Sequence, residues 1–157
     1  GHRDGLKMCY IGDGNNMANS LIVGGLKTGM QVSVACPEGY RPDSRVLDFA
    51  NNYAGFSMFT EPMEAASGAD VIFTDVWASM GQEGEAEERK KIFGKYQVNK
   101  ELLAVANSGC MVQHCLPAHR GEEITADVFE SHADEIFDEA ENRLHAQKAV
   151  MVTLMEK

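Results

Sequence analysis

The sequence lacks any uninterrupted run of about 18 apolar residues, the length a helix needs to cross a bilayer, and it shows no signal peptide. Basic residues are also scarce: 14 Lys and Arg stand against 24 Asp and Glu, which gives a formal net charge of −10. This negative charge argues against a nucleic acid or an anionic membrane surface as a partner. Acidity excludes those partners without naming another, because many enzymes are acidic.

Cysteine is sparse as well, and the four cysteines form no CxxC pair: they are Cys9, Cys36, Cys110 and Cys115. Three of them fall in or beside apolar, strand-like runs. This pattern favours reduced thiols in a cytoplasmic protein over a disulfide framework or a zinc site. No metal site is expected elsewhere, because three histidines lack metal-ligand spacing to any acid or thiol: His2, His132 and His145.

Strand-like and helix-like segments alternate along all 157 residues, a length that suits one domain with one core. Short apolar runs typical of buried parallel strands occupy residues 7–11, 32–35, 56–59, 71–74 and 111–114. Helices are expected at residues 17–27, 46–53, 62–66, 85–93, 126–129 and 140–155, and a further helix that contains 102–106 is expected to start near 98–99. Because the connections are too long for hairpins, we predict an α/β fold. It would be a doubly wound, mainly parallel sheet of about five strands with helices on both faces, a Rossmann-like three-layer arrangement.

Three loops of unusual composition directly follow strands, at residues 12–16, 75–88 and 114–123. The carboxyl ends of parallel strands share one edge of a sheet, and ligands bind at that edge. We therefore expect the three loops to form one site. Within the second loop, Gly81 and Gly84 are candidate hinges for a lid over that site.

The first loop, Gly12-Asp13-Gly14-Asn15-Asn16, partly matches a dinucleotide fingerprint. Met17 replaces its third glycine, and the second strand ends in Ala35-Cys36-Pro37, without a carboxylate for a ribose hydroxyl. We favour a glycine turn that joins a strand to a helix, and a nucleotide-binding Rossmann module stays open as an alternative. The amides of Asn15 and Asn16 are separate candidates for binding a carboxylate or an amine.

The second loop opens with Asp75, and most aspartates in this position cap a helix or form a turn. Here Trp77 and Met80 follow closely and would partly desolvate the carboxylate. Such a carboxylate is suited to pair with an ammonium group, so we predict that this loop holds a small cationic substrate. The pairing would raise the pKa of the ammonium, and a reaction at that amine would need a route for proton loss.

The third loop begins with His114 and Cys115, which together suggest a nucleophile and its base. Adjacent residues on a strand point to opposite faces, so we do not expect these two side chains to pair, and a packing thiol is the simpler interpretation. Pro117 should hold Leu116 extended and leave carbonyls free to accept hydrogen bonds.

Charged residues further along the chain have simple explanations. Glu122 and Glu123 are expected on a charged surface loop. Arg143 is expected to be a solvated helix residue, and it becomes interesting only if its end of the helix faces the site.

Four separated motifs resemble those of the ornithine carbamoyltransferases. Asp-Val-Trp-Ala-Ser-Met-Gly at 75–81 and His-Cys-Leu-Pro at 114–117 are the most specific, while 12–16 and Glu-Asn-Arg at 141–143 agree in order and spacing. The resemblance covers essentially the whole chain. It implies that residues 1–157 are a single ornithine-binding second domain, with 140–157 as its terminal helix. The family's carbamoyl-phosphate domain, with its Ser-Thr-Arg-Thr phosphate loop, is not represented here.

For ornithine, the resemblance implies contacts with Asn16, Asp75, Ser79 and Met80. Asn16 and the Ser79-Met80 segment would hold the α-amino and α-carboxylate end. Asp75 would face the side-chain amine, with Cys115 nearby. A related carbamoyltransferase with another amino-acid or amine acceptor stays open, although the 79–81 segment favours an α-amino acid over putrescine.

For carbamoyl phosphate, the resemblance implies contacts with His114, Cys115, Leu116 and Arg143, and it makes Asp75, Cys115 and His114 the catalytic set. His114 and Arg143 would donate to the carbonyl oxygen, and the backbone carbonyls of Cys115 and Leu116 would accept from the amide. The implied reaction forms citrulline from ornithine without a metal or organic cofactor. The family is typically homotrimeric. This half alone is expected to be monomeric, with little or no activity.

Overall fold

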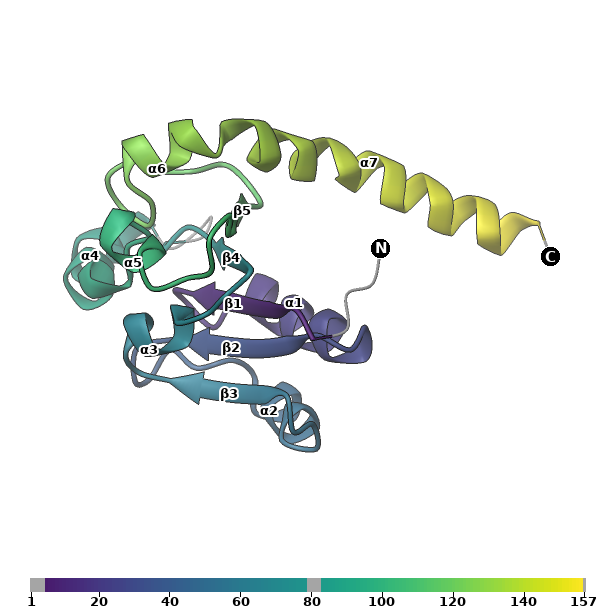
Figure 1. The fold of residues 1–157 in the computed structure, drawn as a ribbon, viewed down its shortest axis with the longest axis horizontal. Coiled ribbons are helices and arrows are strands. Elements are labelled where there is room, and N and C mark those ends of the chain that lie inside the picture. The colour runs from purple at the N-terminus through teal and green to yellow at the C-terminus, as the bar shows by residue number, and fades with distance from the viewer. Residues whose placement is uncertain (1–4, 79–82, 157) are drawn as a thin grey trace.

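The computed structural model describes residues 5–78 and 83–156. Within them, one five-stranded sheet has the order β3-β2-β1-β4-β5, and every neighbouring pair is parallel (Figure 1). The strands are β1 (Lys7–Ile11), β2 (Gln31–Ala35), β3 (Phe56–Phe59), β4 (Val71–Thr74) and β5 (Met111–His114). The strands expected from the sequence are confirmed, except that β2 begins one residue earlier than predicted.

The helices follow the expected order with different bounds in places. They are α1 (Asn16–Lys27), α2 (Ser44–Ala50), α3 (Pro62–Ala66), α4 (Ala86–Phe93), α5 (Lys100–Leu103), α6 (Ala126–Ser131) and α7 (Ala133–Met155), with 3-10 turns at Glu83–Glu85 and Gly94–Tyr96. The Asn99 side chain caps α5 by accepting from the Leu102 N–H. Helix α5 ends before the expected 106 because the following segment turns to bond with Gly68 and Ala69. Helix α7 starts well before residue 140, separated from α6 only by His132.

The sheet buries a separate apolar cluster on each face. Met8 and Tyr10 of β1 point to the side covered by α1 and α2. Cys9 and Ile11 point to the other side, where α3, α5, α6 and the start of α7 pack. This alternation is the period of two that a strand imposes on its side chains. Because β1 is apolar on both faces, it lies in the centre of the sheet, and the predicted three-layer α/β fold is confirmed.

The strand order reverses at β1. From β1 the chain moves outward through β2 and β3, then returns to the opposite side of β1 for β4 and β5. The ends of β1, β4 and β5 are therefore neighbours, and the Thr74 hydroxyl donates to the Ile11 carbonyl at 2.9 Å across this junction. The loops that follow these strands converge on one edge, as the sequence predicted. No helix within 5–78 and 83–156 is long and apolar enough to cross a membrane.

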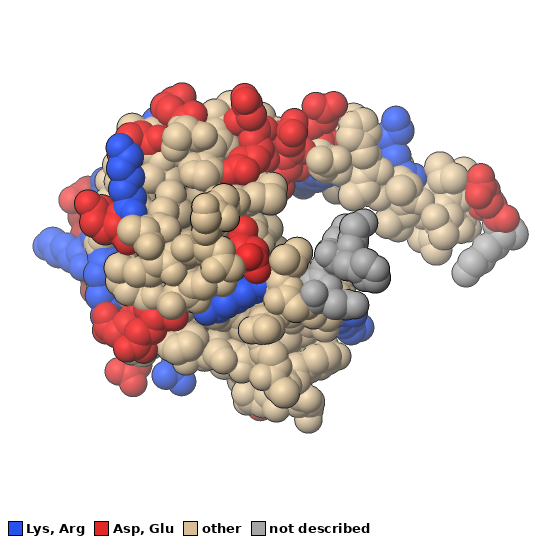
Figure 2. Space-filling model, in the orientation of Figure 1, with Lys and Arg blue, Asp and Glu red and all other residues tan. Residues whose placement is uncertain are grey.

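Helix α7 is unusual because Ile136 is its one buried residue within the described part of the chain. Figure 1 shows its first turns beside β5 and its C-terminal part extending past the sheet. Figure 2 shows that part standing away from the rest of the molecule. Large apolar side chains are exposed along the helix: Phe137, Leu144, Val150, Met151, Val152, Leu154 and Met155.

Candidate functional site

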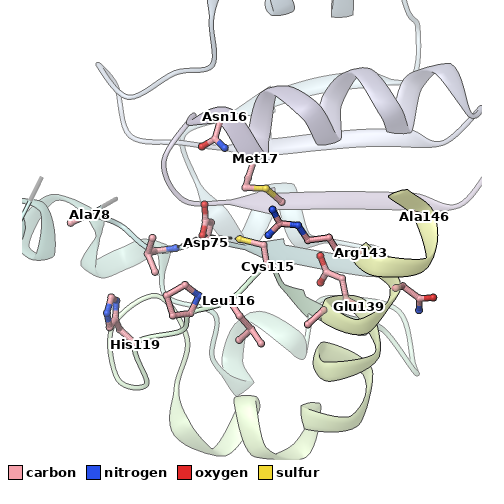
Figure 3. Close-up of a pocket in the computed structure, with 14 residues that line it drawn as sticks. Asn16, Met17, Asp75, Ala78, Cys115, Leu116, His119, Glu139, Arg143 and Ala146 are labelled. Atoms are coloured by element: carbon pink, nitrogen blue, oxygen red, sulfur yellow. Dashed lines mark hydrogen bonds between the residues drawn. The ribbon is translucent and has the colours of Figure 1, made fainter. Parts of the chain in front are cut away.

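An open pocket of about 950 Å³ lies at the carboxyl edge of the sheet (Figure 3). It is lined by the start of α1, by the loops after β4 and β5, and by one face of α7. Five of the residues predicted from the sequence line it together: Asn16, Asp75, Cys115, Leu116 and Arg143. The predicted convergence of the strand-end loops therefore produces a real cavity.

Asp75 is the buried acid of this pocket, with 7% of its surface exposed. Its Oδ2 accepts from the Asn15 side-chain amide at 2.7 Å, and its Oδ1 accepts from its neighbour Val76 N–H at 2.8 Å. Asn15 itself is the N-cap of α1, since its Oδ1 accepts from the N–H groups of Met17 and Ala18. A single amide thus links the helix start to the carboxylate and fixes its orientation.

Cys115 reaches the same carboxylate from β5. Its Sγ donates to Asp75 Oδ1 at 3.0 Å. Burial, helped by this hydrogen bond and by the charges of Asp75 and Glu139, raises the pKa of the Cys115 thiol from 9.0 to about 12. The thiolate is the nucleophilic form, so Cys115 is poorly suited to covalent catalysis at neutral pH. The expectation that it would not pair with its neighbour His114 is confirmed.

Replacing Asp75 with Asn is expected to make Cys115 more reactive. The substitution removes the charge that helps to raise the thiol pKa, so the thiolate fraction at pH 8 should rise about tenfold. Iodoacetamide labelling, followed by mass spectrometry of the peptide that contains Cys115, measures the rate. An unchanged rate would contradict the coupling, and Asp48→Asn on the exposed face of α2 serves as the control.

His114 lies on the opposite side of its strand and is fully buried. Its Nδ1 accepts from the Leu116 N–H at 2.9 Å, and its Nε2 lies 3.0 Å from Glu123 Oε1. Both ring nitrogens are thus engaged within the protein. The structure contradicts the expected donation from His114 to a substrate carbonyl, because the imidazole has no free nitrogen and does not line the pocket.

Glu123 was expected on a charged surface, and that expectation is wrong. The residue is fully buried, and its Oε1 accepts from the His119 N–H at 2.6 Å in addition to its contact with His114. Leu116 was expected to be extended, and that is also wrong. Its φ is 54°, in the left-handed region, because its N–H turns back toward the His114 ring.

Arg143 points from α7 into the pocket (Figure 3), so its end of the helix does face the site. Glu139, one turn earlier on the same face, lines the pocket as well and was missed from the sequence. It is half-buried, and burial raises the pKa of its carboxyl above the ordinary value. The signal that could have found it is the spacing of four residues to Arg143, which places both side chains on one helical stripe.

Arg89 is a second residue that the sequence did not reveal, because it lies among other charged residues in the helix expected at 85–93. Its side chain is buried, and Nη1 donates to Asp13 Oδ2 and to the Trp77 carbonyl, both at 2.8 Å. The guanidinium also lies 5.0 Å from the centre of the Tyr40 ring. Arg89 therefore ties the loop after β1 to the loop after β4, beside Asp75.

Gly14 explains why the first loop does not serve a nucleotide. A Cβ at this position would lie 2.3 Å from the backbone of Arg41 and Pro42, and the Gly14 N–H donates to the Tyr40 carbonyl at 2.8 Å. In a dinucleotide fingerprint the second glycine admits the pyrophosphate. Here residues 40–42 of the protein itself fill that space, so the glycine turn favoured from the sequence is the better explanation.

Three expectations lie outside the described residues: the ligand contacts of Ser79 and Met80 and the hinge at Gly81. Among the residues that the structure describes, potential metal ligands cluster in two places, at Asp75, His114 and Cys115, and at His119, Glu122 and Glu123. In the first cluster the carboxylate and the thiol bond to each other and the imidazole is engaged elsewhere, so that donor set is already satisfied by the protein.

The fold and the pocket together define an α/β domain with an open pocket at the carboxyl edge of a parallel sheet, lined in part by Asp75, Glu139 and Arg143. The chain belongs to the aspartate/ornithine carbamoyltransferase family, because the model of that family's Asp/Orn binding domain matches residues 4–154. The family resemblance predicted from the sequence motifs is confirmed, and the nucleotide-binding alternative is wrong.

Its similar proteins are ornithine carbamoyltransferases. The one from Thermococcus kodakarensis is 56% identical over 160 residues, which cover 99% of this chain and 51% of the relative. The anabolic one from Pyrococcus furiosus is 54% identical over 156 residues, which cover 96% of this chain and 50% of the relative. The crystal structure of the anabolic enzyme from Campylobacter jejuni superposes with a TM-score of 0.91 at 38% identity, covering 96% of this chain and 52% of that one. The chain thus spans about half the length of the curated relatives it matches.

Proposed function

We propose that this chain is the ornithine-binding half of an ornithine carbamoyltransferase. The observation that carries the proposal is Asp75, a buried carboxylate held by Asn15 on the wall of an open pocket. A fixed, desolvated carboxylate is suited to hold an amine. The names of the similar proteins support ornithine as the amine.

The reaction joins the δ-nitrogen of ornithine to the carbamoyl carbon of carbamoyl phosphate. The δ-ammonium first loses a proton, and its lone pair then attacks the carbon while the carbonyl electrons move to oxygen. The tetrahedral intermediate collapses, the bond to the phosphate oxygen breaks, and the nitrogen loses a second proton to give citrulline and phosphate. Positioning and charge stabilisation suffice for such a transfer.

Each pocket group has a role in this proposal. Asp75 orients the δ-amine, and Asn16 holds the amino-acid end. The family resemblance assigns Ser79 and Met80, which lie outside the described residues, to the same end of ornithine. Arg143 donates to the carbonyl oxygen as it becomes negative. The backbone carbonyls of Cys115 and Leu116 accept from the NH₂ group of carbamoyl phosphate.

The phosphate contacts would come from a carbamoyl-phosphate domain outside these 157 residues. We propose that the exposed apolar residues of α7 are covered when that domain is present. We also propose that the two-domain enzyme is a homotrimer and that this chain alone is monomeric. Free thiols at Cys9, Cys36, Cys110 and Cys115 support a cytoplasmic location.

A citrulline assay tests the proposal. The chain alone should bind ornithine in calorimetry and form no measurable citrulline from ornithine and carbamoyl phosphate. Adding a carbamoyl-phosphate domain from a similar enzyme should restore citrulline formation, and putrescine should not replace ornithine. The added domain without this chain is the control. Absence of ornithine binding, together with absence of citrulline in the mixture, would contradict the proposed function.

A further inference from the structure

A chain of hydrogen bonds runs behind the loop that follows β5. The Leu116 N–H donates to His114 Nδ1, and His114 Nε2 faces Glu123 Oε1 at 3.0 Å. The same carboxylate oxygen accepts from the His119 N–H at 2.6 Å. One buried carboxylate thus holds both the start and the middle of this loop, from the side away from the pocket.

The hydrogen bonds fix the tautomer of the His114 ring. A backbone N–H can only donate, so Nδ1 must accept and carries no proton. The ring proton therefore sits on Nε2 and is donated to Glu123. With both nitrogens committed, the ring acts as a rigid spacer that transmits the position of Glu123 to the Leu116 backbone.

Leu116 needs such support because of its backbone conformation. Its φ of 54° lies in the left-handed region, which a non-glycine residue rarely adopts without compensation from its surroundings. The Leu116 N–H bond to His114 is the contact that compensates at this residue. Leu116 and Cys115 also line the pocket, so the supported conformation is the one that faces the ligand.

The burial of the Glu123 carboxylate costs folding free energy, which suggests that this residue has a role other than stability. The residue is fully buried, and its Oε2 makes no hydrogen bond within the described part of the chain, with His119 Nδ1 3.9 Å away. A buried carboxylate with a partly unsatisfied oxygen is expensive, and the hydrogen bonds of its other oxygen must offset that expense. Stability alone would favour an apolar residue here.

We propose that Glu123 and His114 are positioning residues that set the Cys115 and Leu116 carbonyls for the carbamoyl NH₂ group of the donor substrate. This inference rests on the proposed function and deepens it. It replaces the expected contact of the His114 ring with substrate by an indirect role. Glu123 acts at carbamoyl phosphate, whereas Asp75 acts at ornithine.

The test uses the assembled enzyme, made from this chain and a carbamoyl-phosphate domain. Glu123→Ala is expected to lower kcat/KM for carbamoyl phosphate about 30-fold, because a small misplacement of positioning groups is costly. Ornithine affinity, measured by calorimetry on the chain alone, should stay within about twofold, since Asp75 and Asn15 are untouched. Glu123→Gln keeps an oxygen that can accept from both His114 Nε2–H and the His119 N–H. This variant should therefore retain most of the wild-type kcat/KM for carbamoyl phosphate.

The neighbouring Glu122 provides the matched control, because it pairs with Lys90 at the surface. Glu122→Ala should leave both kcat/KM for carbamoyl phosphate and the affinity for ornithine unchanged. A direct structural readout is the ¹⁵N spectrum of the His114 ring, which should show a protonated Nε2 in wild type and lose that pattern in Glu123→Ala. If Glu123→Ala does not fold, Glu123→Asp keeps the charge but withdraws the oxygen, and it should lower kcat/KM for carbamoyl phosphate about tenfold.

Three results would overturn the inference. The first is an unchanged kcat/KM for carbamoyl phosphate in Glu123→Ala and Glu123→Asp. The second is a loss of ornithine affinity in Glu123→Ala as large as its loss of kcat/KM for carbamoyl phosphate. The third is a kcat/KM for carbamoyl phosphate in Glu123→Gln as low as that in Glu123→Ala. Each applies only when the wild-type assembly forms citrulline. A wild-type assembly that forms none, from a chain that binds no ornithine, would instead remove the proposed function itself.

Discussion

Replacing Asp75 by Asn is expected to weaken ornithine binding about 1,000-fold, because an amide cannot neutralise an ammonium group in a desolvated pocket. The contacts of the Asp75 carboxylate with Asn15 and Cys115 add to this loss of affinity. Asn15 donates to Asp75 Oδ2, and an asparagine that turned its NH₂ group toward Asn15 would place two donors face to face. The substituted side chain would then have to rotate, which would also disturb its contact with Cys115.

Isothermal titration calorimetry with ornithine measures this loss on the chain alone. Asp48→Asn, on the exposed face of α2, removes the same charge far from the pocket and should leave the affinity unchanged. Thermal unfolding of both variants shows whether the fold survives. Equal binding heats for wild type and Asp75→Asn would remove Asp75 from the ornithine site.

Replacing Arg89 by Met is expected to destabilise the protein by about 3 kcal/mol, because it leaves a partly buried carboxylate at Asp13 without its partner. For a chain of this size, that loss lowers Tm by about 6–12 °C. Ornithine affinity should also fall about tenfold, since the Trp77 carbonyl loses the donor that fixes the loop beside Asp75.

The pH dependence of the stability of Arg89→Met provides a second, independent test of this prediction. Burial raises the pKa of Asp13, and Arg89 opposes that effect in the wild type. Without Arg89 the folded-state pKa rises further above the unfolded value of 3.8. A raised carboxyl pKa favours folding when the group is protonated, so stability is lost as pH rises through the folded pKa. The stability deficit of the variant should therefore shrink as the pH falls toward 4.

Thermal unfolding monitored by circular dichroism at several pH values measures both effects. Arg45→Met, which removes an exposed pair with Asp43, is the matched control and should change Tm little. A Tm for Arg89→Met equal to that of the control would show that the Asp13 contact carries no stability.

The sheet could be predicted from the sequence because its signals are local. Each strand is a short apolar run bounded by turn residues, and β1 is apolar on both faces, as a central parallel strand must be. The pocket followed from the strand order, since polar residues after β1, β4 and β5 had to meet at one edge. Asp75 and Asn16 became candidates in this way, whereas Cys115 was interpreted as a packing thiol and entered the predicted site only through the family resemblance.

Residues that act through distant partners could not be predicted in the same way. Arg89 lies in a run of charged residues, and only the fold shows that Asp13 and the Trp77 carbonyl receive its side chain. Glu123 looked like a surface acid for the same reason. The family resemblance implied a direct substrate contact for His114, and the motif could not reveal that both ring nitrogens are used inside the protein.

Helix α7 has a consequence for how Arg143 is held. Starting a helix is costly, while each further residue adds its own hydrogen bond, so a helix anchored at one end extends from that anchor. Ile136 supplies the anchor beside β5. Arg143 lies two turns beyond it, where helical propagation rather than packing keeps the backbone ordered. The reach of this cation into the pocket is therefore set by the helix–coil equilibrium of the turns that surround it.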